Sequence, residues 1–316
     1  MSAAGASPTG STAATASGLG GDIYDLGYQR YVGPRLGRGA AIAALFWHTV
    51  RSAFGIGRGS RAKVAPFVLA SFALLPAVLA VGIAAIASQA GEAGGIIEES
   101  SPIQYGTYHS IVATLVMLFC AAQAPELLGR DQRFGVLPIY FSRALERVDY
   151  ALAKVCGLMA GLLVLTVLPQ LIIVVGRILA AADPATGAGR ELPHLPPILV
   201  QGVLSAGLLG GLAIVIAAFT PRRAYATAAI IAAFIIPPVI AALSQRLGAG
   251  DLARFLVFLS PGDVLDGSNA LLFETLAEGR AVRASDVPGI AYPIAALLGA
   301  IGAVAIAVRR YVRIGA

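Results

Sequence analysis

Six apolar blocks, each long enough to cross a lipid bilayer, constrain this chain more than any other feature of its sequence. A transmembrane helix needs about 20 mainly apolar residues. The chain is also 57% hydrophobic and only 13% charged, which is more apolar than an ordinary soluble domain. The sequence therefore predicts an all-α integral membrane protein with six transmembrane helices, over residues 64–87, 109–127, 151–175, 196–219, 224–243 and 290–308.

The basic residues indicate how these spans are oriented, because Lys and Arg near span ends stay on the cytoplasmic side of the membrane. With the N-terminus inside, the inner segments hold 17 of the 23 basic residues and 6 of the 17 acidic ones. Both the N- and C-termini are thus predicted to be cytoplasmic. The net charge of +6 follows from this topology and gives no reason to expect nucleic-acid binding.

The residues before the first span form two regions. Residues 1–22 are almost entirely Ala, Gly, Ser, Thr and Pro, and predict a disordered cytoplasmic tail. Residues 23–63 form a cytoplasmic segment with an amphipathic helix near its end. We expect this helix to lie in the membrane interface, a soluble cytoplasmic helix being the alternative. Its apolar face and the tryptophan at its edge comprise Ile42, Leu45, Phe46, Trp47, Val50 and Phe54.

The six-span domain, residues 64–316, carries signals within its spans and in its longest connection. Pro237 and Pro238 predict a break in the fifth span. Glycines four residues apart in the third and fourth spans permit close helix packing. The outer connection, 244–288, contains apolar residues at helical spacing and predicts a short outer helix on the membrane.

Several classes of chemistry lack the residues that they need. The three histidines are scattered, so the sequence predicts no metal site, and Cys120 and Cys156 are read as small buried hydrophobes. No P-loop is present, because neither lysine follows a glycine. The span interiors are nearly free of ionisable groups, which disfavours ion-driven transport and intramembrane catalysis but not a channel. We expect neither enzymatic activity nor a cofactor in this chain.

The connection between the second and third spans is rich in charged, aromatic and aliphatic residues. A simple linker could be short and polar, so these apolar residues indicate a surface to be covered. In this stretch the sequence resembles the ABC-2 type transporter permease family, in the order of an acidic residue, a Gly-Thr-Leu-like step, a Ser-Arg turn, a Tyr and a Lys. Val136 and Ala144 depart from the family's Thr and Pro.

The resemblance implies roles for particular residues of this loop, 128–150, and its flanks. It implies a cytoplasmic coupling helix that seats in an ATPase. The alternative for the loop is a solvated basic linker. The alternative for its acidic residue, Glu126, is a local ion pair with Arg130 or Arg133. The implied coupling residues are Glu126, Arg130, Arg133, Gly135, Leu137, Ser142, Arg143, Arg147, Tyr150 and Lys154.

The same resemblance, together with the N-terminal segment 23–38, which is similar to actinobacterial members, implies a half-transporter. Two permease copies or paralogues would form the pathway in membrane lipid, and separate ABC ATPase subunits would bind ATP and Mg. The implied activity is export of a drug, antibiotic, peptide or lipid. A membrane scaffold that recruits a cytoplasmic partner and a stand-alone channel are the alternative functions.

Overall fold

The computed structural model describes residues 33, 36–91, 93–142, 145–220, 222–248 and 250–313. Contacts divide the chain into two units, Met1–Arg35 and Leu36–Ala316, and every described helix belongs to the second. The predicted tail, 1–22, and the first part of the cytoplasmic segment therefore lie outside the described residues, as does Arg143.

The described residues form helices and no strand. Most of the helical residues belong to six long stretches, joined by shorter elements. In chain order the elements are α1 (Gly37–Ala53), α2 (Ser60–Ala87), α3 (Ala93–Glu99), α4 (Tyr105–Ala124), the π-helix η1 (Pro125–Gly129), α5 (Arg130–Arg133), α6 (Leu137–Phe141), α7 (Arg147–Ala180), α8 (Pro184–Glu191), the 3-10 helix η2 (Leu192–His194), α9 (Leu195–Phe219), α10 (Arg223–Arg246), α11 (Asp251–Leu256), the 3-10 helix η3 (Val257–Leu259), α12 (Pro261–Leu272), α13 (Arg280–Ala284) and α14 (Ala291–Arg313).

Six stretches of the described chain are helical, long enough and apolar enough to cross a membrane, which confirms the predicted number. They are Ser60–Ala87, Tyr105–Arg133, Arg147–Ala180, Pro184–Phe219, Arg223–Arg246 and Ala291–Arg313. Each includes a predicted block but is longer, except that the last begins one residue later. The largest difference is in the second stretch, where η1 and α5 continue α4 beyond residue 127. The predicted loop 128–150 is consequently reduced to a connection of residues 134–146.

The prediction of a break in the fifth span is wrong. Helix α10 continues from Arg223 to Arg246 with Pro237 and Pro238 inside it. Proline removes one backbone donor and crowds the preceding turn, but neighbouring groups within a helix bundle compensate for this loss often enough that proline does not have to end a transmembrane helix.

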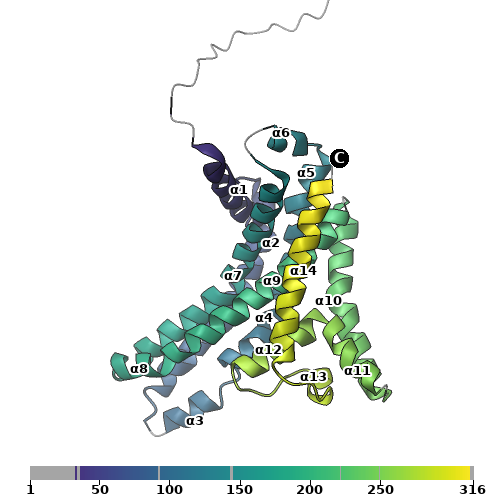
Figure 1. Cartoon of the computed structure of the whole chain (residues 1–316). Helices are drawn as coiled ribbons and strands as arrows, with labels where there is room; N and C mark the ends of the chain where they lie inside the picture. Colours follow the sequence, from purple (N-terminus) through teal and green to yellow (C-terminus); the bar gives the residue numbers. More distant parts are fainter. Residues whose placement is uncertain are drawn as a thin grey trace, which may run out of the picture. The chain divides into compact units, whose positions relative to one another are not determined.

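The two ends of the helix bundle have different elements (Figure 1). One end, called the α1 end below, carries α1, α5, α6 and the last turn of α14. The other, called the α12 end, carries α3, α8, α11, α12 and α13. Among the described residues, basic side chains outnumber acidic ones at the α1 end by fourteen to four, whereas the α12 end has six basic and ten acidic residues.

Helix α1 packs against α7 through the face that its sequence pattern predicts. Leu45 is buried and Ile42, Phe46, Val50 and Phe54 are half-buried, while Trp47 is exposed at the edge of this face. The pattern missed Thr49, which is fully buried and donates to the Leu45 carbonyl at 2.7 Å. A Cβ on Gly157 of α7 would lie 2.5 Å from Thr49 Cγ2, so this glycine allows the close approach. Whether α1 also contacts lipid stays a prediction.

Helices α9 and α14 meet along a seam of small residues. A Cβ on Gly207 would lie 3.0 Å from Ala300 Cβ, and one on Gly211 would lie 2.9 Å from Ala303 Cβ. The glycine spacing in the fourth span thus serves close packing, as its sequence suggested.

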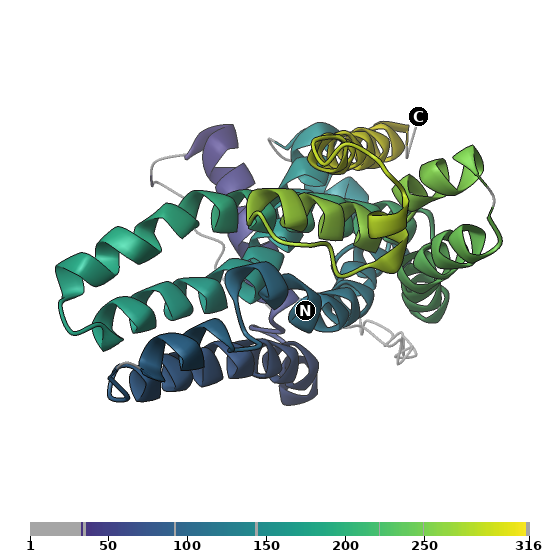
Figure 2. The same cartoon turned by 90° about the horizontal axis from the view of Figure 1, so that it is seen from below.

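Helix α12 closes the opposite end of the bundle. It contacts α14, α9 and α4, and Figure 2 shows it lying across that end. Its side chains Val264, Leu265, Ser268 and Asn269 are buried, although its sequence has no long apolar run. The Ser260 hydroxyl caps the helix by accepting from the Asp263 amide at 3.1 Å. The predicted outer helix is present as α11, but the sequence pattern missed α12.

Candidate functional site

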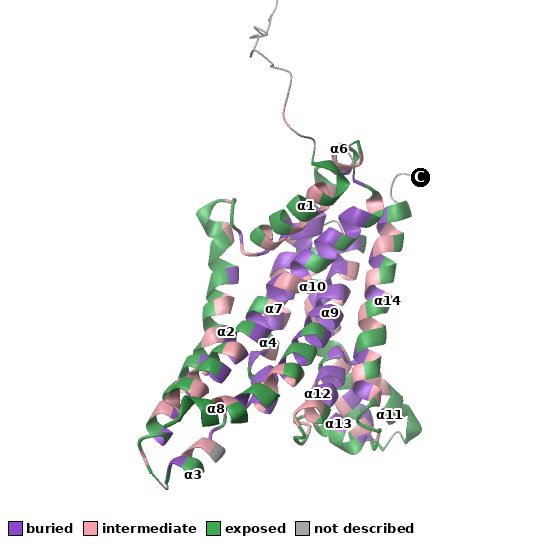
Figure 3. Ribbon diagram, turned by 60° about the vertical axis from the view of Figure 1, so that its left-hand side comes forward, coloured by how far each residue is buried: buried purple, intermediate pink, exposed green. Residues whose placement is uncertain are grey.

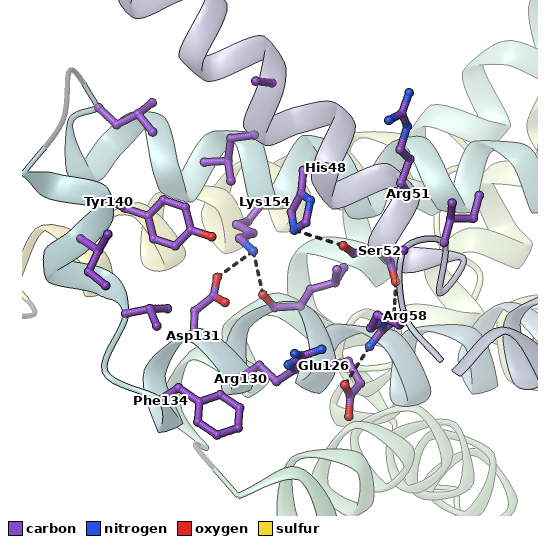
Figure 4. A pocket seen from close by; sticks show the side chains of 18 of the residues that line it. His48, Arg51, Ser52, Arg58, Glu126, Arg130, Asp131, Phe134, Tyr140 and Lys154 are labelled. Carbon is purple, nitrogen blue, oxygen red and sulfur yellow. Dashed lines mark hydrogen bonds and ion pairs between the residues drawn. The ribbon is translucent and has the colours of Figure 1, made fainter. Parts of the chain in front are cut away.

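A groove of about 950 Å³ lies at the α1 end, between α1 and the chain from η1 to residue 145. Figure 4 shows that charged side chains from several elements meet in it, with Lys154 and Asp131 pointing toward each other. The lining combines charged residues with aliphatic and aromatic ones. It comprises Ala41, Ala44, Leu45, His48, Arg51, Ser52, Ile56, Gly57, Arg58, Glu126, Leu127, Arg130, Asp131, Phe134, Val136, Ile139, Tyr140, Leu145 and Lys154.

The groove holds an ion pair between a buried lysine and a half-buried aspartate. The Lys154 ammonium lies 2.8 Å from Asp131 Oδ2 and donates to the Leu127 carbonyl at 3.0 Å. The Tyr150 hydroxyl donates to the same carboxylate oxygen at 2.7 Å. Lysine and tyrosine four residues apart on α7 share one helix face, so both reach the single acid on α5. This arrangement fixes the end of the second span to the start of the third.

A second carboxylate connects three segments that are distant in sequence. Glu126 Oε2 accepts from Arg58 at 2.8 Å, and Glu126 Oε1 lies 2.6 Å from a guanidinium nitrogen of Arg223. Arg58 precedes α2, and Arg223 begins α10. The alternative of a local pair with Arg130 or Arg133 is therefore wrong, because the carboxylate is directed at the first and fifth spans instead.

The helix carrying these two acids has a π-turn that contains Glu126 and ends two residues before Asp131. Residues Pro125–Gly129 form η1, which adds one residue to a turn and so rotates the following side chains relative to a regular α-helix. Pro125 lacks an amide hydrogen, which is consistent with a local change of hydrogen-bond pattern here. As a result, Glu126 faces Arg58 and Arg223 while Asp131 faces α7.

The last turn of α14 also joins this site. Tyr311 is fully buried, and its ring centroid lies 5.2 Å from that of Tyr150. Gln132 donates to the Tyr311 hydroxyl at 3.0 Å, and Arg147 donates to the Val312 carbonyl at 2.8 Å. The sequence analysis did not identify Gln132 or Tyr311, whose positions depend on the register of three helices.

The connection itself presents a different set of residues. Gly135 adopts a φ of 63°, a left-handed conformation that favours glycine. Leu137 is buried, whereas Phe134 and Ile139 are 67% and 60% exposed. Arg133 lies over the Phe134 ring at 5.7 Å from its centroid. The connection thus anchors itself through Leu137 and leaves two large apolar side chains at the surface.

The groove has an excess of positive charge. Arg58 and Lys154 have acidic partners, but Arg51 and Arg130 line the groove without an ion pair to any described acid. Burial, followed by the positive charge of Lys154, lowers the pKa of His48, so this side chain is neutral at pH 7. Burial and the charge of Asp131 raise the pKa of Tyr140. A ligand of this surface would need apolar groups and negative charge.

The structure describes all of the ten predicted coupling residues except Arg143, and it buries some of them and exposes others. Tyr150 and Lys154 are buried and act within the chain, so they do not offer a contact to another protein. Arg130 is exposed beside the groove, Arg133, Gly135 and Arg147 lie around it, and Ser142 ends α6 with its hydroxyl donating to Ile139 O at 2.9 Å. The sequence analysis missed Asp131 and Arg58. A lysine next to an apolar span needs an acidic partner, and this requirement could have identified Asp131.

In the described part of the chain no cluster of three or more His, Cys, Asp and Glu side chains is arranged to hold a metal ion. No protein-family model matches the sequence, and a search of curated proteins finds no similar one.

Proposed function

We propose that this chain is the permease subunit of an ABC-2 type exporter in a bacterial cell membrane. Its α1 end faces the cytoplasm and receives a separate ABC ATPase subunit that binds ATP and Mg, and both chain termini are cytoplasmic. The excess of basic residues at that end supports this orientation, because Lys and Arg are retained on the cytoplasmic side.

The observation that carries the proposal is the exposed apolar edge of a positively charged groove. Phe134 and Ile139 are too exposed to serve the fold of this chain, and they stand beside Arg51 and Arg130. A partner that places an apolar, acidic helix between α1 and α6 would cover these side chains and neutralise the charge. A soluble ATPase with such a helix meets this requirement.

The internal contacts of the groove support a coupling role. Movement of the connection would reach the third span through Asp131 and Lys154, the fifth through Glu126 and Arg223, and the sixth through Gln132 and Tyr311. A docked ATPase that closes on ATP would therefore displace several spans at once. A second permease copy would complete the export pathway for a drug, antibiotic, peptide or lipid.

The test is co-purification of the tagged chain in mild detergent, with mass spectrometry of what accompanies it. We expect a P-loop ATPase with the native chain, and its loss from a Phe134→Asp, Ile139→Asp variant. A control is Leu276→Asp, which introduces a charge at a more exposed apolar position, 84% exposed, at the α12 end. A chain that purifies without an ATPase, or retains it in the double variant, contradicts the proposal and favours a scaffold or a stand-alone channel.

A further inference from the structure

A chain of buried polar side chains crosses the centre of the bundle near the α12 end. His109 of α4, Gln170 of α7 and Gln201 and Ser205 of α9 are at most 5% exposed. Figure 3 shows that α4, α7 and α9 carry much of the buried surface of the bundle. Polar groups inside a membrane bundle are costly unless they are hydrogen-bonded, and a titratable one there is a candidate functional group.

Along this row of polar side chains, the hydrogen bonds that join Gln170, Gln201 and His109 run in one direction. Gln170 Nε2 donates to Gln201 Oε1 at 3.3 Å, and Gln201 Nε2 in turn donates to His109 Nδ1 at 2.6 Å. Gln201 Nε2 also donates to the Ser205 hydroxyl at 3.3 Å, and Gln170 Nε2 donates to the Thr166 carbonyl at 3.1 Å. Because an amide nitrogen can only donate, this contact requires the neutral His109 tautomer that accepts at Nδ1 and carries its hydrogen on Nε2.

One hydrogen-bond acceptor in this row of side chains has no partner. Gln170 Oε1 is buried and has no hydrogen-bond partner. When a proton binds His109 Nδ1, this atom becomes a donor, and Gln201 must rotate its amide to present Oε1 to it. The Gln201 amide nitrogen then faces Gln170, whose unpartnered oxygen supplies the acceptor that the reversed chain needs. Ser205 adapts to either direction, because a hydroxyl both donates and accepts.

We propose that His109 is a proton-binding site in the core of the bundle, and that its protonation causes a concerted rotation of the Gln201 and Gln170 amides. Protonation of His109 and rotation of the two amides together change the hydrogen bonds that join α4, α9 and α7. The inference does not depend on the proposed transport function, since it concerns contacts within this chain.

The groups around His109 are arranged so that no described charged side chain bonds to it. Arg177 and Glu191 are held by Tyr105, one turn away on α4, through a cation-π contact and a hydrogen bond of 2.5 Å. Helix α2 has no titratable side chain after Lys63, and α9 has none. Tyr108 lies on α4 itself, His194 stacks on Tyr105, and the other titratable or charged groups at this end, on helices packed against α4, are Arg246, Asp263 and Asp266.

The experiment is a pH titration followed by nitrogen NMR of the full chain labelled at its three histidines, His48, His109 and His194. His109→Gln assigns the signal by its disappearance. We expect Nδ1 of His109 to change from an unprotonated acceptor to a protonated nitrogen between pH 8 and pH 4, while size-exclusion chromatography shows a folded protein. An Nδ1 that stays unprotonated throughout in the folded chain overturns the proposal.

Variants of the leftover acceptor test the relay itself. Gln170→Leu removes it and should lower the midpoint of the His109 titration by about one pH unit, the equivalent of one hydrogen bond. The control Gln245→Leu, at a glutamine whose amide donates to the Ala253 carbonyl, should leave the midpoint unchanged. Gln170→Glu, a stronger acceptor, should raise it and serves if the leucine variant does not fold. Equal midpoints in all these chains would exclude the rotation.

Discussion

The two ends of the bundle arrange their apolar and charged residues differently. At the α12 end, an amphipathic helix is folded back so that Val264 and Leu265 are buried against the spans. At the α1 end, ion pairs join distant segments, while Phe134 and Ile139 of the connection remain exposed. Both ends expose large apolar side chains, and Phe255 and Leu276 at the α12 end are 71% and 84% exposed. The α1 end differs in that its exposed apolar side chains lie beside a positively charged groove.

The largest effect on stability is expected from the ion pair of Lys154 and Asp131 at the α1 end. Lys154→Met leaves the half-buried Asp131 without its cation, with only the Tyr150 hydroxyl still donating to it, and should destabilise the protein by about 3 kcal/mol. The double variant Lys154→Met, Asp131→Leu should recover most of this loss, because no uncompensated charge remains. The check is reversible unfolding in detergent followed by circular dichroism. A single variant as stable as the native chain would show that the pair does not hold the spans together.

A smaller effect is expected at Glu126, whose two partners differ in exposure. Arg58 is 16% exposed and Arg223 is 57% exposed in their side chains. Glu126→Gln and Arg58→Gln should each cost about 2 kcal/mol, as for hydrogen bonds to charged groups. Arg223→Gln should cost less than about 1 kcal/mol, because solvent screens its pair. A double-mutant cycle measures the two couplings, and equal values would contradict the predicted ranking.

At the α12 end, we expect the stability of the protein to depend on pH through Asp263. Burial, together with the nearby charge of Asp266, raises the pKa of Asp263, and Asp263 Oδ2 is buried without a partner. Because the folded-state pKa is raised, Asp263 favours folding when protonated, and this contribution is lost as pH rises through that pKa. Asp263→Asn should raise the melting temperature on the order of 2 °C at pH 8 and leave it unchanged at pH 4. Asp286→Asn, at an 89% exposed side chain, is the control, and an equal shift there would refute the assignment.

The smallest effect on stability is expected where the α1 end is uncovered. Phe134→Ser and Ile139→Ser should each change the free energy of unfolding by no more than about 0.5 kcal/mol, since both side chains are exposed. Leu137→Ser is the buried comparison on the same connection and should be clearly destabilising. Similar losses for all three would mean that the connection buries more than its exposed fractions indicate.

Much of the fold could be predicted because it depends on local composition. Apolar blocks give six spans, and the spacing from Ile42 to Phe54 gives the packing face of α1. Helix α12 could not be found in this way, since its sequence mixes Asp, Gly, Ser and Asn with few apolar residues. Its Ser260 cap with an acid three residues later is a usable signal for its start.

The site was less predictable for a geometric reason. The resemblance named Tyr150 and Lys154 as coupling residues, but a motif gives order along the chain and does not say which side chains point inward. That depends on the phase of the helix after η1, which a π-turn changes by one residue. Asp131, Arg58 and Tyr311 come together only through this phase and through packing between spans.

The contact of α1 with the third span also bears on the order of biosynthesis. Arg38 pairs with Asp149, 111 residues later in the chain, and Thr49 fits against Gly157. During translation α1 therefore emerges before its docking surface exists, and it waits while two spans enter the membrane. Tyr311 is made later still, so the aromatic cover over Tyr150 is closed only when the sixth span arrives. The lining of the groove is thus complete once the third span is made, and the sixth span later adds the contact between Tyr311 and Tyr150.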